Sequence, residues 1–254
     1  MCSIIQNIEI AEDIYELTLR GELVQRMEEP GQFVHVRVSN DINPLLRRPL
    51  SIAKIDHINN EFTLIYRKQG KGTATLAKRK RGEKVNVLGP LGSGFPVSET
   101  NPGQTALVVG GGIGVPPLYE LSTQLVESGI NVIHVLGFRT ARSMFYTQQF
   151  RELGPTWIAT EDGSYGVKGY VTNILSEQSL KFDTVYACGP HPMLKALKAA
   201  LPNHKMFISL EERMGRGIGA CYSCVCRTND DANAHSYKKI CSDGPVFAAK
   251  EVVL

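Results

Sequence analysis

Alternation of apolar and polar residues marks the first hundred residues of the chain. A period of two is typical of half-buried strands, and turn residues separate the runs at 29–31, 59–60 and 81–82. Several short strands at this spacing predict a small antiparallel β-barrel over residues 1–99, with one brief helix over residues 73–80. The alternating apolar positions are Tyr15, Leu17 and Leu19, then Val34, Val36 and Val38, then Phe62, Leu64 and Tyr66, and finally Val85 and Val87.

The pattern changes near residue 100, where short continuous apolar runs alternate with helical periodicity. Such runs are typical of buried parallel strands, and strands that alternate with helices predict a parallel α/β sheet over residues 100–207. The helix after the first strand carries leucines on one face and has Gly129 as its C-cap. The expected strands are 105–109, 131–136, 157–160 and 183–187, and the expected helices include the segment with Leu118, Leu121 and Leu125 and the segment 193–201.

Glycine-rich turns follow these strands, at the edge where parallel sheets bind their ligands. The first turn contains Gly110, Gly111, Gly112 and Gly114 and precedes a helix, so its backbone N–H groups can approach phosphates. Its spacing differs from the G-x-G-x-x-G dinucleotide fingerprint. A later turn reads Cys188-Gly189-Pro190-His191. Because no partner base is identifiable for the thiol, we interpret Cys188 as a small residue beside the nucleotide, and His191 as a loop residue.

Cysteines cluster near the end of the chain, in a segment that we delimit as residues 208–254. Thiolates bind iron–sulfur clusters or zinc, and neighbouring glycines can aim backbone N–H groups at them. A plant-type two-iron cluster requires Cys-x4-Cys-x2-Cys and a remote cysteine. Cys221, Cys224 and Cys241 fit that spacing, but Arg216 occupies the first position. Cys226 leaves a four-cysteine zinc site open as an alternative.

Composition narrows the classes of function. The chain has 254 residues, 43% of them hydrophobic, with 28 basic and 25 acidic residues, so no nucleic-acid partner is indicated. The basic run 78–81 fits the solvated end of a helix. Neither a secretory signal nor a membrane-length apolar run is recognisable. Most of the cysteines lie in one metal-like cluster, which fits a reducing compartment better than a disulfide framework. We therefore expect a cytoplasmic protein without a membrane partner.

Two segments of the first domain suit an anionic ligand. Arg47 and Arg48 precede Pro49-Leu50-Ser51, and guanidinium groups can grip a pyrophosphate in a bidentate manner. The loop 67–73 holds two glycines before the expected helix, an arrangement that can cradle phosphate through backbone N–H groups. Each segment is a weak signal by itself.

Taken together, these motifs resemble the ferredoxin-reductase superfamily and, more closely, the electron-transfer subunits of type B dihydroorotate dehydrogenases. The resemblance covers essentially the whole chain. The segments that carry it are 46–51, 88–95, 110–120, 162–166, 188–190, 217–222 and 241–247.

The resemblance implies three cofactor sites and a partner. FAD occupies the barrel, NAD(H) the middle domain and a [2Fe–2S] cluster the C-terminal module, which passes electrons to or from an FMN-containing dihydroorotate dehydrogenase catalytic subunit in pyrimidine synthesis. Two copies of each chain are expected to assemble, with the cysteine loop and the tail 245–254 as the docking surface. The implied flavin residues are Arg48, Pro49, Leu50, Ser51, Ile65, Tyr66, Arg67, Gly72 and Thr73; the implied nucleotide residues are Gly110, Gly111, Gly112, Gly114, Cys188, Gly189 and Pro190; and the implied cluster ligands are Cys221, Cys224 and Cys241.

The chain departs from the family pattern at Arg216, where a cluster cysteine is expected. Losing a thiolate and gaining a cation should make the cluster labile and raise its reduction potential. Three readings stay open: Cys226 or a non-cysteine group completes the site, position 216 is an altered residue in a nearly normal protein, or the cluster is absent. Arg139 and Arg142 could bind the ribose 2′-phosphate of NADPH, although the family favours NADH. Two different functions also fit the motifs: a reductase subunit that serves a hydrogenase, ferredoxin or oxygenase, and a zinc-stabilised regulatory module.

Overall fold

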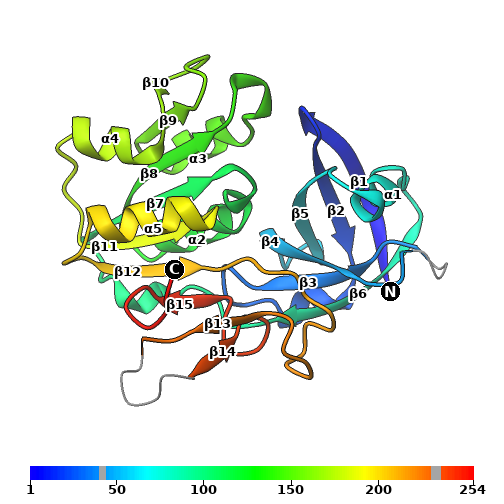
Figure 1. The fold of residues 1–254 in the computed structure, drawn as a ribbon. Helices are drawn as coiled ribbons and strands as arrows, with labels where there is room; N and C mark the ends of the chain where they lie inside the picture. The colour runs from blue at the N-terminus through cyan, green and yellow to red at the C-terminus, as the bar shows by residue number, and fades with distance from the viewer. Residues whose placement is uncertain (40–43, 230–235) are drawn as a thin grey trace.

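The chain folds into a β-barrel, an α/β layer beside it and a C-terminal segment that runs beneath both (Figure 1). This computed structural model describes residues 1–39, 44–229 and 236–254. Within those ranges no helix is both long and apolar enough to cross a membrane.

The antiparallel barrel predicted from the alternation is confirmed. Across the described residues its strands close in the order β1-β2-β5-β4-β3-β6. The alternating residues point inward, so that Leu17, Val36 and Leu64 are fully buried in the barrel core. The strands are β1 (Cys2–Ala11), β2 (Ile14–Arg20), β3 (Phe33–Arg37), β4 (Arg48–Asp56), β5 (Glu61–Arg67) and β6 (Lys84–Leu91), and a 3₁₀ turn, η1 (Glu22–Arg26), joins β2 to β3.

The barrel helix α1 (Lys71–Ala77) lies slightly earlier in the chain than the expected 73–80. Its C-terminal end is fixed by a tertiary contact that local sequence does not reveal. The Asn7 side-chain amide donates to the carbonyl oxygens of Leu76 (2.9 Å) and Arg79 (3.0 Å), which ties the end of the helix to β1. The basic run 78–81 therefore follows the helix.

The parallel sheet is also confirmed, and it receives an extra strand from the end of the chain. In the described residues its order is β10-β9-β8-β7-β11-β12-β15, and β15 pairs antiparallel with β12. Every expected strand is present, and Gly129 follows the first helix with a left-handed φ of 74°. The strands are β7 (Thr105–Gly111), β8 (Asn131–Phe138), β9 (Thr156–Thr160), β10 (Val167–Lys168), β11 (Thr184–Cys188), β12 (Lys205–Ser209) and β15 (Val246–Ala248).

Helices cover the sheet, and their apolar faces fill the space between the two layers. Leu118, Leu121 and Leu125 are fully buried, as their spacing predicts. The helices are α2 (Pro116–Glu127), α3 (Thr147–Leu153), α4 (Val171–Glu177) and α5 (His191–Ala200), with the 3₁₀ turns η2 (Val97–Glu99), η3 (Gly112–Gly114) and η4 (Ala141–Ser143). His191 thus begins a helix and does not lie in the loop that precedes it.

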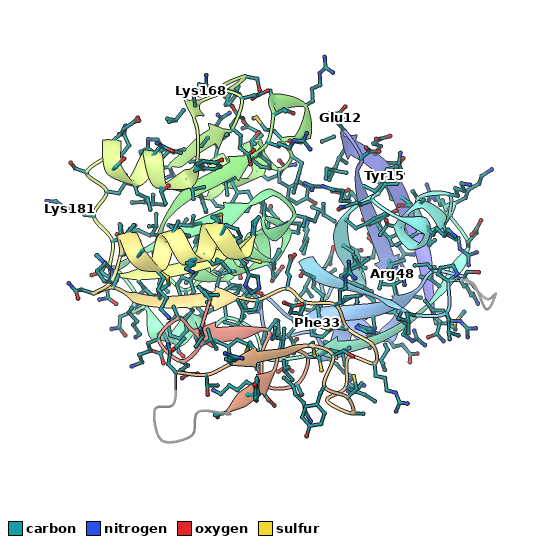
Figure 2. All side chains as sticks on the ribbon, in the orientation of Figure 1. Glu12, Tyr15, Phe33, Arg48, Lys168 and Lys181 are labelled. Atoms are coloured by element: carbon teal, nitrogen blue, oxygen red, sulfur yellow. The ribbon has the colours of Figure 1, made fainter. Side chains whose placement is uncertain are left out.

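The cysteine segment shares its core with the nucleotide sheet. The short hairpin β13 (Val225–Arg227) and β14 (Tyr237–Lys239) lies beneath the sheet (Figure 1). Cys224, Cys241 and Phe247 belong to the same apolar cluster as Leu107 and Val109 of β7. Phe33 of the barrel joins this cluster, at the place where barrel and C-terminal segment meet (Figure 2). Part of the expected docking tail 245–254 packs inward, because Val246, Phe247 and Val252 are buried, whereas Val253 is 46% exposed.

Candidate functional site

A cavity of about 790 Å³ opens between the barrel and the start of the cysteine segment. Its volume is within the usual range for cofactor pockets. Every residue that the resemblance implied for the flavin lines it: Arg48, Pro49, Leu50, Ser51, Ile65, Tyr66, Arg67, Gly72 and Thr73.

Arg48 and Gly72 form the cationic end of this cavity. The Arg48 guanidinium lies against Gly72, where any Cβ would overlap it, so the absence of a side chain lets the cation sit beside the backbone of α1. Thr73 shapes the loop, because its hydroxyl oxygen accepts from the Gln69 N–H at 3.0 Å. Arg48 is seen on the barrel in Figure 2. A cation beside close backbone suits the pyrophosphate of a dinucleotide.

Arg47 does not share this role. Its guanidinium donates to the carbonyl oxygen of Asn86 (3.1 Å), to Asn86 Oδ1 (2.6 Å) and to the carbonyl oxygen of His35 (3.3 Å). These bonds join β3 and β6 to the segment before β4. Both arginines line the cavity, and Arg48 is the one that lies against Gly72.

The middle of the cavity is walled by β5. Tyr66 is buried, stacks on Tyr15 with ring centroids 5.7 Å apart, and donates its hydroxyl to Asn7 Oδ1 at 3.0 Å. Burial raises the pKa of Tyr66, so the phenol stays protonated. Arg67, at the end of β5, reaches toward the glycine turn of the sheet, where a Cβ on Gly112 would lie 3.6 Å from its guanidinium. Arg67 thus lies between the barrel pocket and the nucleotide turn.

Sequence reasoning missed the opposite wall, which consists of Ile113, residues 209–214 and Pro245. Glu211 is its most notable member. Its side chain opens into the cavity, and the surrounding protein raises the pKa of its carboxyl, an effect that Arg67 and His191 partly oppose. The Glu-Glu-Arg run before the glycines is visible in the sequence, but no local pattern indicates that it crosses to face the barrel.

The two glycine turns of the sheet meet backbone to backbone. A Cβ on Gly114 would lie 2.5 Å from the carbonyl of Cys188 and the nitrogen of Gly189. A Cβ on Gly111 would lie 2.5 Å from the Met193 sulfur and 3.0 Å from Pro190 Cδ. β7 and β11 are adjacent strands, with Cys188 in register with Gly110. The structure therefore brings together all the residues implied for the nucleotide: Gly110, Gly111, Gly112, Gly114, Cys188, Gly189 and Pro190.

The Cys188 thiol is unsuited to nucleophilic attack. It is fully buried, and burial together with the nearby Glu211 carboxylate raises its pKa, while a hydrogen bond with Ser209 opposes the shift weakly. A protonated, buried thiol serves as a small wall residue at the end of β11.

The cysteine loop presents backbone donors to its sulfurs. Gly219 donates its N–H to Cys241 Sγ at 3.2 Å. Hydrogen bonds from Ser223 and from the Arg216 backbone lower the pKa of Cys221, and the Arg216 charge lowers it further. Cys224 and Cys241 are buried, and burial, followed by the neighbouring Cys241 thiol, raises the pKa of Cys224 to about 11.

The residues present fit a cluster better than a single metal ion. Among the described residues, no three His, Cys, Asp or Glu side chains converge closely enough to hold one ion. A two-iron cluster distributes its ligands over two metals, and backbone N–H groups directed at sulfur suit it. Cys226 lies apart on β13, where its thiol contacts the Lys238 carbonyl oxygen at 3.7 Å. Arg216 is exposed and offers no thiolate, so Cys221, Cys224 and Cys241 are the cysteines left in the expected register.

The fold and cavity define a flavin- and nicotinamide-dependent reductase of the ferredoxin-reductase type with an iron–sulfur segment. Residues 108–199 match the model of the oxidoreductase NAD-binding domain, and residues 211–253 match the iron–sulfur cluster binding domain of dihydroorotate dehydrogenase B. The chain belongs to the family of dihydroorotate dehydrogenase B (NAD⁺) electron transfer subunits, which confirms the resemblance found in the sequence.

Individual relatives support this placement. The electron transfer subunits of Bacillus mycoides (strain KBAB4) and Bacillus cereus (strain AH187) are each 59% identical over 251 residues, covering 99% of this chain and 97% of theirs. An NADH-dependent reduced ferredoxin-NADP oxidoreductase, described for flavin-based electron bifurcation, has a TM-score of 0.87 at 30% identity, covering all of this chain and 90% of its own. An Amycolatopsis cytochrome P450 reductase shares the fold, with a TM-score of 0.68 at 21% identity, over 79% of this chain and 64% of its own.

Proposed function

We propose that this chain carries electrons between NAD(H) and a separate catalytic subunit that oxidises dihydroorotate in pyrimidine synthesis, with FAD and a [2Fe–2S] cluster as its own cofactors. The observation that carries the proposal is the shared cavity. The barrel motif, Ile113 of the glycine turn and residues 209–214 before the cysteines all line it, so segments that lie far apart in the sequence meet at one cavity. We assign residues 1–99 to FAD, 100–207 to NAD(H) and 208–254 to the cluster.

The barrel residues bind and orient the flavin in this proposal. Arg48 would neutralise the pyrophosphate beside Gly72 and Thr73, while Pro49, Leu50 and Ser51 would line the flavin and Ile65, Tyr66 and Arg67 would continue that wall. FAD supplies the conversion between two-electron hydride transfer and single-electron steps. Arg48→Ala should weaken FAD binding at least tenfold, because a charge-assisted bidentate contact is lost. Ultrafiltration and absorbance near 450 nm would measure bound FAD; retention of full FAD affinity would refute the role of Arg48.

The glycine turns hold the nicotinamide nucleotide. Gly110, Gly111, Gly112 and Gly114 admit the phosphates, and Cys188, Gly189 and Pro190 close the other side. Arg139 and Arg142 are exposed beyond β8, and we propose NADH as the preferred nucleotide, as in the name of the relatives. Comparing the rates of flavin reduction by NADH and NADPH tests this preference, and faster reduction by NADPH would overturn it.

Cys221, Cys224 and Cys241 are the proposed cluster ligands from this chain. With Arg216 at the first-ligand position, we expect a labile cluster that loses iron readily. Arg216→Cys should raise the retained iron and acid-labile sulfide several-fold, because the fourth thiolate completes the site. Iron and sulfide analysis after gel filtration measures this change. Identical iron content in both proteins would show that position 216 does not limit the cluster.

The partner surface follows from the exposed part of the cysteine loop. The side chains of Ile218 and Tyr222 are 55% and 78% exposed, next to the proposed cluster, and exposed apolar side chains of this kind mark interfaces. We propose that an FMN-containing catalytic subunit docks there, two copies of each chain forming the complex. All six cysteines lie in described ranges as free thiols, in keeping with a reducing cytoplasm. Ile218→Glu should weaken co-elution with the catalytic subunit while leaving bound FAD unchanged.

A further inference from the structure

His35 is a buried polar side chain whose ring nitrogens find no partner within the described residues. It lies on β3 of the barrel and is 0% exposed. Neither Nδ1 nor Nε2 has a hydrogen-bond partner in the described parts of the chain. Buried polar groups are almost always satisfied, so an unpaired imidazole requires an explanation. His134, which is also fully buried, is paired through both nitrogens, to Thr156 and Ser122, each at 3.1 Å.

The imidazole of His35 is neutral and therefore carries one N–H donor and one acceptor. Burial, with a smaller contribution from the Arg47 guanidinium, lowers its pKa to about 4. Arg47 is itself fixed to the carbonyl oxygen of His35 and to Asn86, so the positive charge stays close. No nearby carboxylate is among the causes of the shift. The ring keeps one N–H that needs an acceptor.

The nitrogen end of the ring faces the cysteine loop. A Cβ on Gly217 would lie 2.6 Å from His35 Nε2, and Gly217 adopts a left-handed φ of 72°. Only a glycine lets the imidazole and the loop approach so closely. On the same loop, the Gly219 N–H points at Cys241 Sγ at 3.2 Å. Phe33, whose ring centroid is 5.8 Å from that of His35, packs in the apolar cluster that contains Cys224 and Cys241. The histidine thus lies beneath the loop that surrounds the cysteines.

His35 also adjoins the flavin side of the barrel. It is in register with Pro49 of β4, which lines the flavin cavity. The side chain therefore contacts the cysteine loop from a strand that pairs with the wall of the flavin cavity. No acceptor for its N–H exists among the described protein atoms, and the loop next to it is built to surround sulfur.

We propose that His35 donates its N–H to the sulfur shell of the bound iron–sulfur cluster, a thiolate or a bridging sulfide, and so acts as a positioning residue that tunes the cluster. The inference rests on the proposed cluster site. A hydrogen bond to cluster sulfur stabilises the reduced state, which carries the more negative charge, and therefore raises the reduction potential. His35 is not one of the protein's iron ligands in this proposal.

Two variants of similar size separate the N–H from the shape of the side chain. His35→Leu removes the donor, and His35→Gln keeps an N–H. Each is prepared as the full chain and assayed for iron, sulfide and FAD, and the midpoint potential of its cluster is measured by a redox titration monitored by electron paramagnetic resonance. We expect a more negative midpoint in the Leu variant, recovery toward the parent in the Gln variant, and unchanged FAD content in both. Loss of iron in the Leu variant alone also supports the donor role.

Several results would overturn the donor role. An unchanged midpoint in the Leu variant, or the same change in both variants, would show that only the shape of the ring matters. Iron loss in both variants has the same meaning. A strongly coupled nitrogen in the pulsed spectrum of the parent would make His35 a ligand and not a donor. A parent chain that binds no iron would refute the proposed cluster itself, which distinguishes that failure from failure of the histidine.

Discussion

The barrel meets its two neighbours in different ways. Toward the nucleotide domain, the chain's own polar groups close the interface: Glu120 of α2 accepts the Ile55 N–H of β4 at 2.9 Å, and Tyr146 donates its hydroxyl to Glu16 at 2.6 Å. Toward the cysteine segment, a backbone contact such as Ser93 N–H to the Gly244 carbonyl oxygen (2.7 Å) stands beside an unpaired buried imidazole.

At the first interface the polar groups pair with other protein atoms. At the second, the acceptor that we propose for the imidazole N–H is a cofactor. Glu120 belongs to the glycine-turn motif, yet its carboxylate holds the strand that begins with the flavin motif, Arg48 to Ser51. It thereby fixes the nucleotide turn relative to the flavin wall. The cysteine side leaves a donor without an acceptor among the described atoms, at a place where sulfur is expected. Damage to the two interfaces should therefore produce different deficits.

The largest effect is expected from Gly217→Ala, which acts on the cysteine side. The added Cβ meets the buried His35 ring and must adopt a left-handed φ. Strain and overpacking together should cost about 2–4 kcal/mol locally. Iron content should fall several-fold while bound FAD stays near one per chain. Gly103→Ala is the matched control, because Gly103 also has a left-handed φ but nothing lies within 4 Å of its added Cβ. Equal iron in both variants would contradict the contact with His35.

Glu120→Ala tests the nucleotide side. It leaves the partly buried Ile55 N–H without its acceptor, which should cost about 1–3 kcal/mol. We expect a lower melting temperature and a slower reduction of FAD by NADH in stopped-flow measurements, with iron content unchanged. Glu120→Gln keeps a side-chain oxygen for Ile55 and should recover most of both properties. Iron loss in the Ala variant would show that the two interfaces are not independent.

Glu120 also predicts a pH dependence. Burial raises the pKa of its carboxyl above the ordinary value of 4.5, so the folded state binds more protons than the unfolded state just above that pH. This contribution to stability is complete below about pH 4.5 and is lost as the pH rises through the folded-state pKa. Denaturant unfolding at several pH values measures this effect. Above about pH 4.5 the free energy of unfolding should decline less with rising pH in Glu120→Gln than in the parent. If the free energy of unfolding changed equally with pH in both proteins, Glu120 would be excluded as a source of the pH dependence.

Tyr146→Phe should have the smallest effect. It removes one hydroxyl that reaches Glu16, at an interface that retains the Glu120 contact and the Glu12 N–H to Arg142 carbonyl bond at 3.0 Å. The expected cost is about 1 kcal/mol, or a melting temperature lower by about 2–4 °C. Calorimetry measures it. A larger loss than that of Glu120→Ala would reverse the ranking of the two contacts.

Local periodicity was enough to predict most of the fold. The alternation around Leu17 and Leu64 and the leucines of α2 each report their own strand or helix, because burial repeats within a few residues. The glycine turns are recognisable because their glycines are consecutive or nearly so in the sequence. Contacts between distant segments left no such trace: the pairing of β15 with β12, Glu211 facing the barrel pocket and His35 beneath Gly217 all depend on how whole elements pack.

The outer strand β15 is synthesised late. Val246 to Ala248 pair with Phe207 to Ser209 of β12, but they are translated after every cysteine in the chain. A nascent chain that has already exposed its thiols thus still lacks the outer strand that anchors them to the sheet. A premature stop before Val246 would leave β12 without its outer partner and the buried cysteines without part of the apolar cluster that covers them.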